Sequence, residues 1–142
     1  MSVMQNTHRY KTTINSPNLW LKDFPWKKFS GHKYSRGRVV IYGGNKEFIG
    51  ATILSSLAAL KTGAGSVKII CSKHSLHTYS VKFPSVLKVE INNIHHLKKF
   101  LQREKISSIL IGPGAGSNKK IKEITKLILK KIKYVVLDAD SL

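Results

Sequence analysis

The chain has 142 residues, of which 42% are hydrophobic, enough for one domain with a core of its own. Its 25 lysines and arginines outnumber 7 aspartates and glutamates and give a formal charge of +18, which attracts polyanions in general. The single cysteine excludes an intramolecular disulfide, and no stretch approaches the roughly 20 apolar residues of a membrane span. The N-terminus lacks the apolar segment of a signal peptide, so we expect a cytoplasmic protein without a membrane partner.

The charge raises the alternative of a basic nucleic-acid-binding protein. Of the 25 basic residues 21 are lysines, and they are spread along the chain from Lys11 to Lys133. Arginine, which reads base edges and grips phosphates with two parallel hydrogen bonds, occurs only four times. We therefore expect solvated basic faces and no specific nucleic-acid partner. A remnant protein without function is the third hypothesis.

Residues 1–30 show no sustained periodicity and are expected to form an arm or linker ahead of a domain over residues 31–142. Both tryptophans lie in this arm, in the segment LWLKDFPW. Exposed tryptophans are costly, so the segment is expected to dock on the domain or on a missing partner. The domain opens with a polar, glycine-bounded segment in which His32 and Lys33 either touch a ligand phosphate or belong to a surface loop.

The rest of the chain is organised around residues 38–71. The apolar run 39–42 stops at Gly43 and Gly44, as expected for a strand that helices cover on both faces. A helix follows, and residues 66–71 form the next strand. This spacing predicts a right-handed crossover in a parallel sheet, with the glycine turn at the carboxyl edge, where such sheets bind ligands.

The helix of this unit is expected to run from about Gly50 to Gly63, which lies where a left-handed C-terminal cap is wanted. Its apolar face is predicted at Ile53, Leu57 and Leu60, which recur at helical spacing. The strand that comes next ends in the lone cysteine. Because this strand is apolar, Cys71 is expected to be a packed, unreactive thiol.

Strands and helices continue to alternate after a polar stretch over residues 72–85 to which we assign no element. Asn93 is expected to cap the first of two further helices, and the strand before it carries polar positions typical of a sheet edge. The predicted elements are a strand over 86–91, a helix over 94–104, a strand over 107–111, a helix over 119–131 and a strand over 134–137. The alternation predicts an α/β fold with three αβα layers and a mostly parallel sheet.

Three polar or glycine-rich segments follow strands of the predicted sheet and therefore meet at its carboxyl edge. The expected pocket lining is Gly43, Gly44, Gly112, Gly116, Asp138 and Asp140. Glycines let backbone N–H groups approach a ligand, and the helices that follow add a positive N-terminal dipole, so an anionic or nucleotide ligand fits. Neither turn matches a Walker A loop or the GxGxxG fingerprint of dinucleotide folds.

The two aspartates have two interpretations. Two residues apart in an extended segment, Asp138 and Asp140 point to the same side and suit Mg²⁺, a ribose or a substrate hydroxyl. Equally, they suit a helix cap or a turn just past the strand. The histidine pairs His74–His77 and His95–His96 lack partners at a recognised spacing, so no metal site and no catalytic residue are predicted.

Four segments, in this order and spacing, resemble one known family: HKYSRGRVVIYGG, IGATILSSLAALKTGAGSV, LIGPGAGSN and VVLDADSL. They are similar to the ADP- or ATP-dependent NAD(P)H-hydrate dehydratases of the ribokinase-like superfamily, over about residues 17–142. The arm resembles the linker that precedes the C-terminal dehydratase domain in bifunctional NAD(P)H-hydrate repair enzymes. The resemblance implies a ribokinase-like domain, of which this chain looks like the N-terminal half.

The resemblance also implies a reaction. These enzymes dehydrate the hydrated nicotinamide ring of NADH or NADPH, with ADP or ATP as phosphoryl donor and Mg²⁺ as cofactor, by phosphorylation of the ring hydroxyl and loss of phosphate. Carried over residue by residue, it places Ala51, in the position of a threonine-glycine-alanine motif, on the hydrated nicotinamide nucleotide. Gly114, in the glycine-proline-glycine turn, is implied to contact the same ligand.

The sequence departs from the family in two ways. Ile49 stands where the family has a threonine, which removes a hydroxyl. The family's histidine-proline-glycine-glutamate loop, its lysine-bearing ADP segment and the motif with its catalytic aspartate do not occur in the 142 residues. We expect a truncated member that is inactive by itself, or active where a complementing chain or homo-oligomer supplies the rest. The last strand, internal in a complete sheet, would then expose an unpaired edge and promote self-association.

Overall fold

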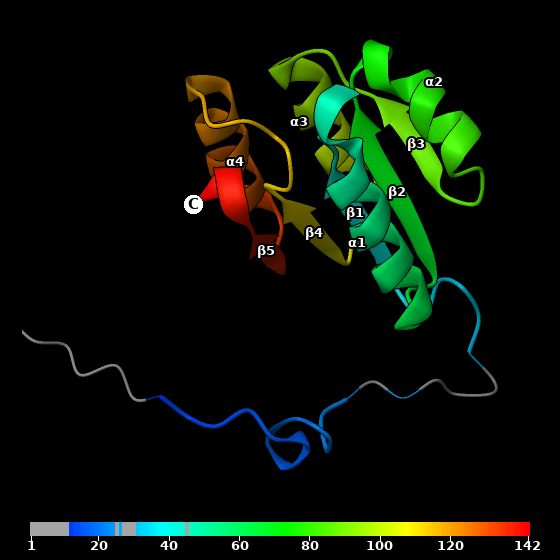
Figure 1. The fold of residues 1–142 in the computed structure, drawn as a ribbon, viewed down its shortest axis with the longest axis vertical. Helices are drawn as coiled ribbons and strands as arrows, with labels where there is room; N and C mark the ends of the chain where they lie inside the picture. The colour runs from blue at the N-terminus through cyan, green and yellow to red at the C-terminus, as the bar shows by residue number, and fades with distance from the viewer. Residues whose placement is uncertain (1–11, 25, 27–30, 45) are drawn as a thin grey trace, which may run out of the picture.

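A five-stranded parallel sheet with helices on both faces forms the domain in the computed structural model, which describes residues 12–24, 26, 31–44 and 46–142 (Figure 1). The strand order is β3-β2-β1-β4-β5. The helices and strands, with the 3-10 helices marked η, are η1 (Pro17–Leu19), β1 (Arg38–Tyr42), η2 (Lys46–Phe48), α1 (Ile49–Lys61), β2 (Ser66–Cys71), α2 (Lys73–Lys82), β3 (Leu87–Glu90), α3 (Ile94–Arg103), β4 (Ser108–Ile111), α4 (Lys119–Lys131), β5 (Val135–Leu137) and η3 (Ala139–Ser141). The predicted α/β class and its three layers are confirmed.

The layer of α3 and α4 packs through apolar side chains at helical spacing. Leu97 and Leu101 of α3, with Ile121, Ile124 and Ile128 of α4, are buried against β1, β2 and β4. Each of the two helices begins at an asparagine whose side chain accepts a hydrogen bond from a backbone N–H of the first turn. Periodicity and capping therefore locate both helices correctly, and the cap predicted at Asn93 is confirmed.

The layer of α1 and α2 differs from its prediction in two respects. Leu57, expected on the buried face of α1, is 42% exposed, while Thr52 and Ser56 are buried. Helix α2 occupies the polar stretch to which no element was assigned, and its buried residues are Ser75 and Tyr79. Apolar periodicity misses both features because the buried positions of these helices are small or hydrogen-bonded polar residues.

The two outer strands of the sheet are β3 and β5. The edge position predicted for β3 from its polar residues is thereby confirmed. Among the described residues strand β5 pairs with β4 alone, and Val136 at its centre is 58% exposed. The self-association expected from such an edge stays a prediction.

The part of the arm that the structure describes has its own small aromatic contact. The ring of Phe24 lies 5.8 Å from that of Trp20 and 4.7 Å from that of Trp26, measured between centroids. Both tryptophans remain substantially exposed, at 43% and 63%. Most of the arm up to residue 30 lies outside the described residues, and the division into an arm over 1–30 and a domain over 31–142 stays a prediction. No helix in the described ranges is long and apolar enough to cross a membrane.

The loop before β1 lies at the amino edge of the sheet, opposite to the glycine turns. His32 and Lys33 are exposed there, and the backbone N–H of Ser35 donates a 3.2 Å hydrogen bond to the Nδ1 atom of His32. The backbone N–H of Gly65, just before β2, donates to the carbonyl of Gly37 and closes the loop against the sheet. Of the two interpretations of this segment, the structure matches the surface loop.

Candidate functional site

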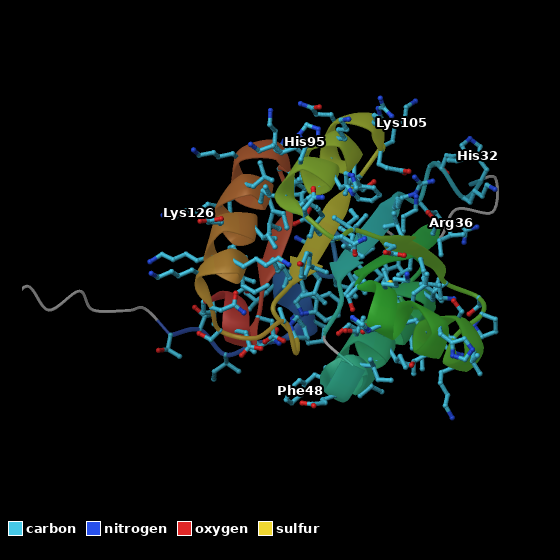
Figure 2. The ribbon with its side chains drawn as sticks, turned by 90° about the horizontal axis from the view of Figure 1, so that it is seen from above. His32, Arg36, Phe48, His95, Lys105 and Lys126 are labelled. Atoms are coloured by element: carbon cyan, nitrogen blue, oxygen red, sulfur yellow. The ribbon has the colours of Figure 1, made fainter. Side chains whose placement is uncertain are left out.

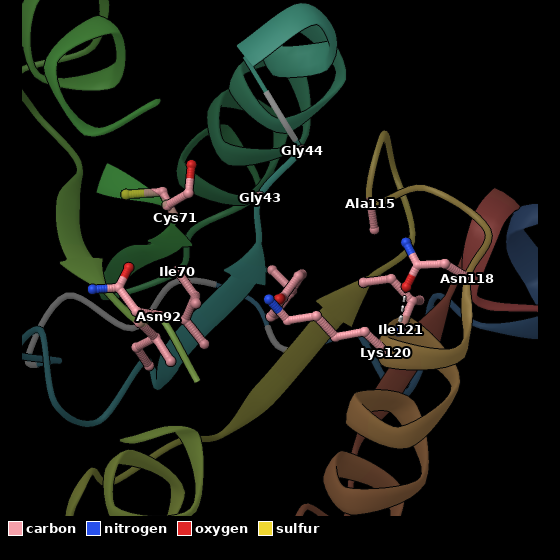
Figure 3. A pocket seen from close by; sticks show the side chains of 12 residues that line it. Gly43, Gly44, Ile70, Cys71, Asn92, Ala115, Asn118, Lys120 and Ile121 are labelled. Carbon is pink, nitrogen blue, oxygen red and sulfur yellow. Dashed lines mark hydrogen bonds between the residues drawn. The ribbon is translucent and has the colours of Figure 1, made fainter. Parts of the chain in front are cut away.

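A cleft of about 360 Å³ opens at the carboxyl edge of the sheet. It lies beside β1, the strand from which successive connections lead to opposite sides of the sheet. From β1 the crossover through α1 leads to β2 on one side, whereas the crossover through α3 leads back to β4 on the other. Such a switch point is where open α/β sheets bind their ligands. The residues that line it are Tyr42, Gly43, Gly44, Ile70, Cys71, Ser72, Ile91, Asn92, Ala115, Asn118, Lys120 and Ile121 (Figure 3).

The Gly43–Gly44 turn that forms the middle of the cleft is held by the α1 and α2 layer. The N–H of Gly44 donates a 2.9 Å hydrogen bond to Oγ1 of Thr52, and the Tyr79 hydroxyl donates a 3.2 Å bond to the carbonyl of Gly44. Both side chains are fully buried. Sequence reasoning identified the turn but not its two supports, Thr52 in the apolar helix α1 and Tyr79 in the polar helix α2.

The second glycine turn packs directly against neighbouring backbone. Gly112 has a φ of +129°, and a Cβ at this position would lie 1.5 Å from the carbonyl oxygen of Asp138. Gly114 has a φ of +66°, and a Cβ there would lie 2.4 Å from Cβ of Phe48. At both positions the missing side chain makes room for the chain itself. A Cβ on Gly44 would lie 2.9 Å from the carbonyl oxygen of Gly114, so the two glycine turns touch.

The two aspartates after β5 act on the backbone around them. The side chain of Asp138 accepts from the backbone N–H of Ser141, whose hydroxyl lies 3.0 Å from the N–H of Asp138, and these two contacts form a capping box at η3. Oδ2 of Asp140 accepts a 2.8 Å hydrogen bond from the N–H of Gly116. This geometry matches the cap and turn interpretation, with Asp140 tying the second glycine turn to the end of the chain.

The predicted site residues fall into three groups. Gly43 and Gly44 line the cleft. Gly112, Gly116, Asp138 and Asp140 are not among the residues that line it, and Ala115 is the lining residue of the second glycine turn. Ala51 and Gly114 lie beyond the first glycine turn, on the side of α1, where Ala51 is exposed in the first turn of the helix and Gly114 is partly buried. Whether these residues bind a ligand stays a prediction.

Burial keeps the cysteine and the tyrosine of the cleft protonated at neutral pH. Burial, reinforced by the charge of Glu90, raises the pKa of the Cys71 thiol to about 11, although Lys88 acts in the opposite direction. Burial likewise raises the pKa of the Tyr42 phenol. The packed position expected for this cysteine is confirmed, since Cys71 is buried. A protonated thiol is a poor nucleophile, and its low reactivity stays a prediction. The described part of the chain groups no three histidine, cysteine or carboxylate side chains for a metal ion.

The sequence profile of the NAD(P)H-hydrate dehydratases matches residues 39–142. The chain belongs to the NAD(P)H-hydrate dehydratase family. It is 32% identical over 135 residues to an ADP-dependent (S)-NAD(P)H-hydrate dehydratase of Listeria monocytogenes, which covers 93% of this chain and 47% of that protein. It is also 32% identical over 121 residues to a bifunctional NAD(P)H-hydrate repair enzyme of Dictyoglomus turgidum, with 78% of this chain and 24% of that enzyme covered.

Solved structures agree on the fold. A ribokinase-like superfamily protein of Enterococcus faecalis superposes with a TM-score of 0.70 at 26% identity, over 82% of this chain and 41% of the other. An ADP/ATP-dependent NAD(P)H-hydrate dehydratase of Bacillus subtilis, crystallised with ATP and Mg²⁺, superposes with a TM-score of 0.70 at 24% identity, over 83% and 42%. The chain therefore has a ribokinase-like fold and spans less than half the length of these relatives.

Proposed function

We propose that this chain forms the substrate-binding half of an ADP- or ATP-dependent NAD(P)H-hydrate dehydratase, a lyase that repairs hydrated NADH or NADPH. The observation that supports the proposal is the position of the cleft. The cleft of this chain, a member of the family, lies at the switch point of the sheet and adjoins the two touching glycine turns. On this proposal, Ala51 and Gly114 contact the hydrated nicotinamide ring. The location that goes with this chemistry is the cytoplasm.

The nucleotide donor and its metal belong elsewhere on this proposal. The carboxylates near the glycine turns, Asp138 and Asp140, are engaged in backbone hydrogen bonds. On this proposal these carboxylates hold the chain's own backbone, and ADP or ATP and Mg²⁺ are bound by a complementing chain. That chain would also pair with the exposed side of β5.

Binding of hydrated NADH by the 142-residue chain tests the proposal. Ala51→Trp places a large side chain on an exposed helix position beside the proposed ring site and is expected to weaken binding at least tenfold. Ala58→Trp is the matched control, since Ala58 is exposed on the same helix two turns away. Calorimetric titration of both variants decides the matter. Equal affinities in the two variants would refute contact at Ala51.

Activity provides a second test. The chain is expected to regenerate NADH absorbance from its hydrate only when ADP, Mg²⁺ and the remaining part of a relative, such as the Listeria dehydratase, are all present. Activity from the chain alone with ADP and Mg²⁺ would contradict the assignment of catalysis to a complementing chain. Retained binding without any restored activity would leave the chain a binding module and refute the enzymatic part of the proposal.

A further inference from the structure

Among the described residues that line the cleft, Lys120 is the one charged side chain, and it is exposed to solvent. It extends from the first turn of α4 across the opening toward β1 and β2, between the walls that carry Asn92 and Asn118 (Figure 3). In the part of the chain that the structure describes, ion pairs are formed by Glu104 with Arg38 and Lys68. Lys120 has no carboxylate partner there. The cleft therefore holds a cation that nothing in the described chain neutralises.

The other polar side chains that line the cleft are uncharged, and both asparagines among them already form a hydrogen bond within the protein. The Oδ1 atom of Asn118 accepts a 3.0 Å hydrogen bond from the N–H of Ile121, which leaves its amide nitrogen as a donor. The Nδ2 atom of Asn92 donates 2.7 Å to Glu90, which leaves its oxygen as an acceptor. The hydroxyl of Tyr42 is protonated at neutral pH and adds another donor.

An anion is the ligand charge that this lining accommodates. An exposed lysine, the amide nitrogen of Asn118 and the absence of a carboxylate among the described lining residues favour a phosphate over a cationic group. The 13-residue helix α4 directs its N-terminal dipole into the same space, which adds to the attraction. Ile70, Ile91 and Ile121 provide apolar surface beside the cation, which suits a ligand with both a phosphate and a less polar part.

We propose that this cleft binds a phosphate group of the nicotinamide dinucleotide and that Lys120 is its cationic contact. The inference rests on the proposed function, in which the ring of the same ligand lies against Gly114. Ala115, the next residue, lines the cleft, so one ligand can reach both places. In the dinucleotide a ribose separates the nicotinamide from its phosphate, which corresponds to a ring on one side of the glycine turns and a phosphate on the other.

Affinity for two ligands that differ in phosphate tests the inference. NADH carries the same phosphates as its hydrate, whereas reduced nicotinamide riboside carries none. Lys120→Gln is expected to weaken NADH binding about tenfold, the loss of one charge-assisted hydrogen bond, and to leave riboside binding unchanged. Lys126→Gln is the matched control, because Lys126 is exposed on the same helix and points away from the sheet (Figure 2). Added salt should weaken NADH binding more in the wild type than in Lys120→Gln.

The outcomes separate this inference from the function on which it rests. Equal losses of NADH affinity in Lys120→Gln and Lys126→Gln would mean general attraction by a basic protein and overturn the phosphate site. A parallel loss of riboside affinity in Lys120→Gln would place Lys120 on the ring and overturn it as well. If Lys120→Gln weakens NADH binding and Ala51→Trp does not, the phosphate site stands and the ring assignment fails. The reverse result sinks the phosphate site and retains the proposed function.

Discussion

The two helical layers of this domain are built on different chemistry. The α3 and α4 layer buries leucine and isoleucine, and its helices begin at asparagine caps. The α1 and α2 layer buries Thr52, Ser56 and Ser75 together with the ring of Tyr79, and its apolar residues Leu54 and Leu57 face outward at 68% and 42% exposure. Both layers pack apolar side chains on the sheet, and the α1 and α2 layer adds buried side-chain hydrogen bonds to the Gly43–Gly44 turn.

The polar layer is the one that positions the candidate site. Its Thr52 and Tyr79 bond to both the N–H and the carbonyl of Gly44, so the turn between β1 and α1 is fixed from behind. The apolar layer contributes stability and, at the first turn of α4, the cation of the cleft. Substitutions in the α3 and α4 layer should therefore mainly change the free energy of unfolding, whereas substitutions at Thr52 or Tyr79 should also change the geometry of the Gly44 turn.

The largest expected effect lies in the apolar layer. Ile128 of α4 is fully buried, so Ile128→Ala should lower the free energy of unfolding by about 2–5 kcal/mol through lost burial and a residual cavity. Leu57→Ala in the polar layer should cost less than about 1 kcal/mol, because that leucine is half exposed. Urea denaturation of both variants measures the contrast. Equal losses would contradict the half-exposed position of Leu57 in this chain.

A smaller effect is expected from the polar layer. Thr52→Val keeps the side-chain volume but leaves the buried N–H of Gly44 without its acceptor, which should cost about 1–3 kcal/mol. Thr125→Val in α4 is the matched control, because the buried Oγ1 of Thr125 has no hydrogen-bond partner among the described residues. It should be neutral or stabilising by up to about 1 kcal/mol. The same denaturation experiment compares them. A Thr52→Val protein as stable as the wild type would remove the basis for a hydrogen-bonded layer.

The smallest effect concerns a polar contact of the apolar layer, at the end of α3. Glu104 forms ion pairs with Arg38 of β1 and Lys68 of β2, the latter at 2.8 Å. The hydrogen bond from Lys68, supported by the two positive charges against the opposing effect of burial, lowers the pKa of Glu104 from its ordinary value of 4.5. Glu104→Gln should cost about 0.5–1 kcal/mol at pH 7.

The pH dependence of this contribution has a definite sign. A carboxyl whose pKa is lower in the folded state stabilises the protein above its unfolded pKa of about 4.5, and the gain disappears as the pH falls through the folded value. The stabilities of wild type and Glu104→Gln should therefore converge at acid pH. Thermal unfolding between about pH 3 and pH 7 measures the gap. A gap that widens toward acid would contradict the assigned role of the ion pairs.

Most of the fold follows from local sequence pattern. The apolar runs of β1, β2 and β4, the amphipathic repeats of α3 and α4 and the cap at Asn93 each act within a few residues, so the elements and their parallel order are predictable. The buried Tyr79 in the polar stretch of α2 illustrates the failure. A polar helix becomes stable only through the contacts that its few buried groups make in the folded domain.

The carboxyl edge of the sheet was determined by the sequence, because glycines and aspartates placed directly after parallel strands meet there in any such fold. Which of these residues face a ligand was decided by the tertiary structure. Gly112 packs against the backbone of Asp138 and Asp140 accepts a hydrogen bond from the N–H of Gly116. Asn92 and Lys120, which carry no sequence motif, line the cleft instead. Side-chain direction depends on packing between elements distant in the chain, and spacing along the sequence does not encode it.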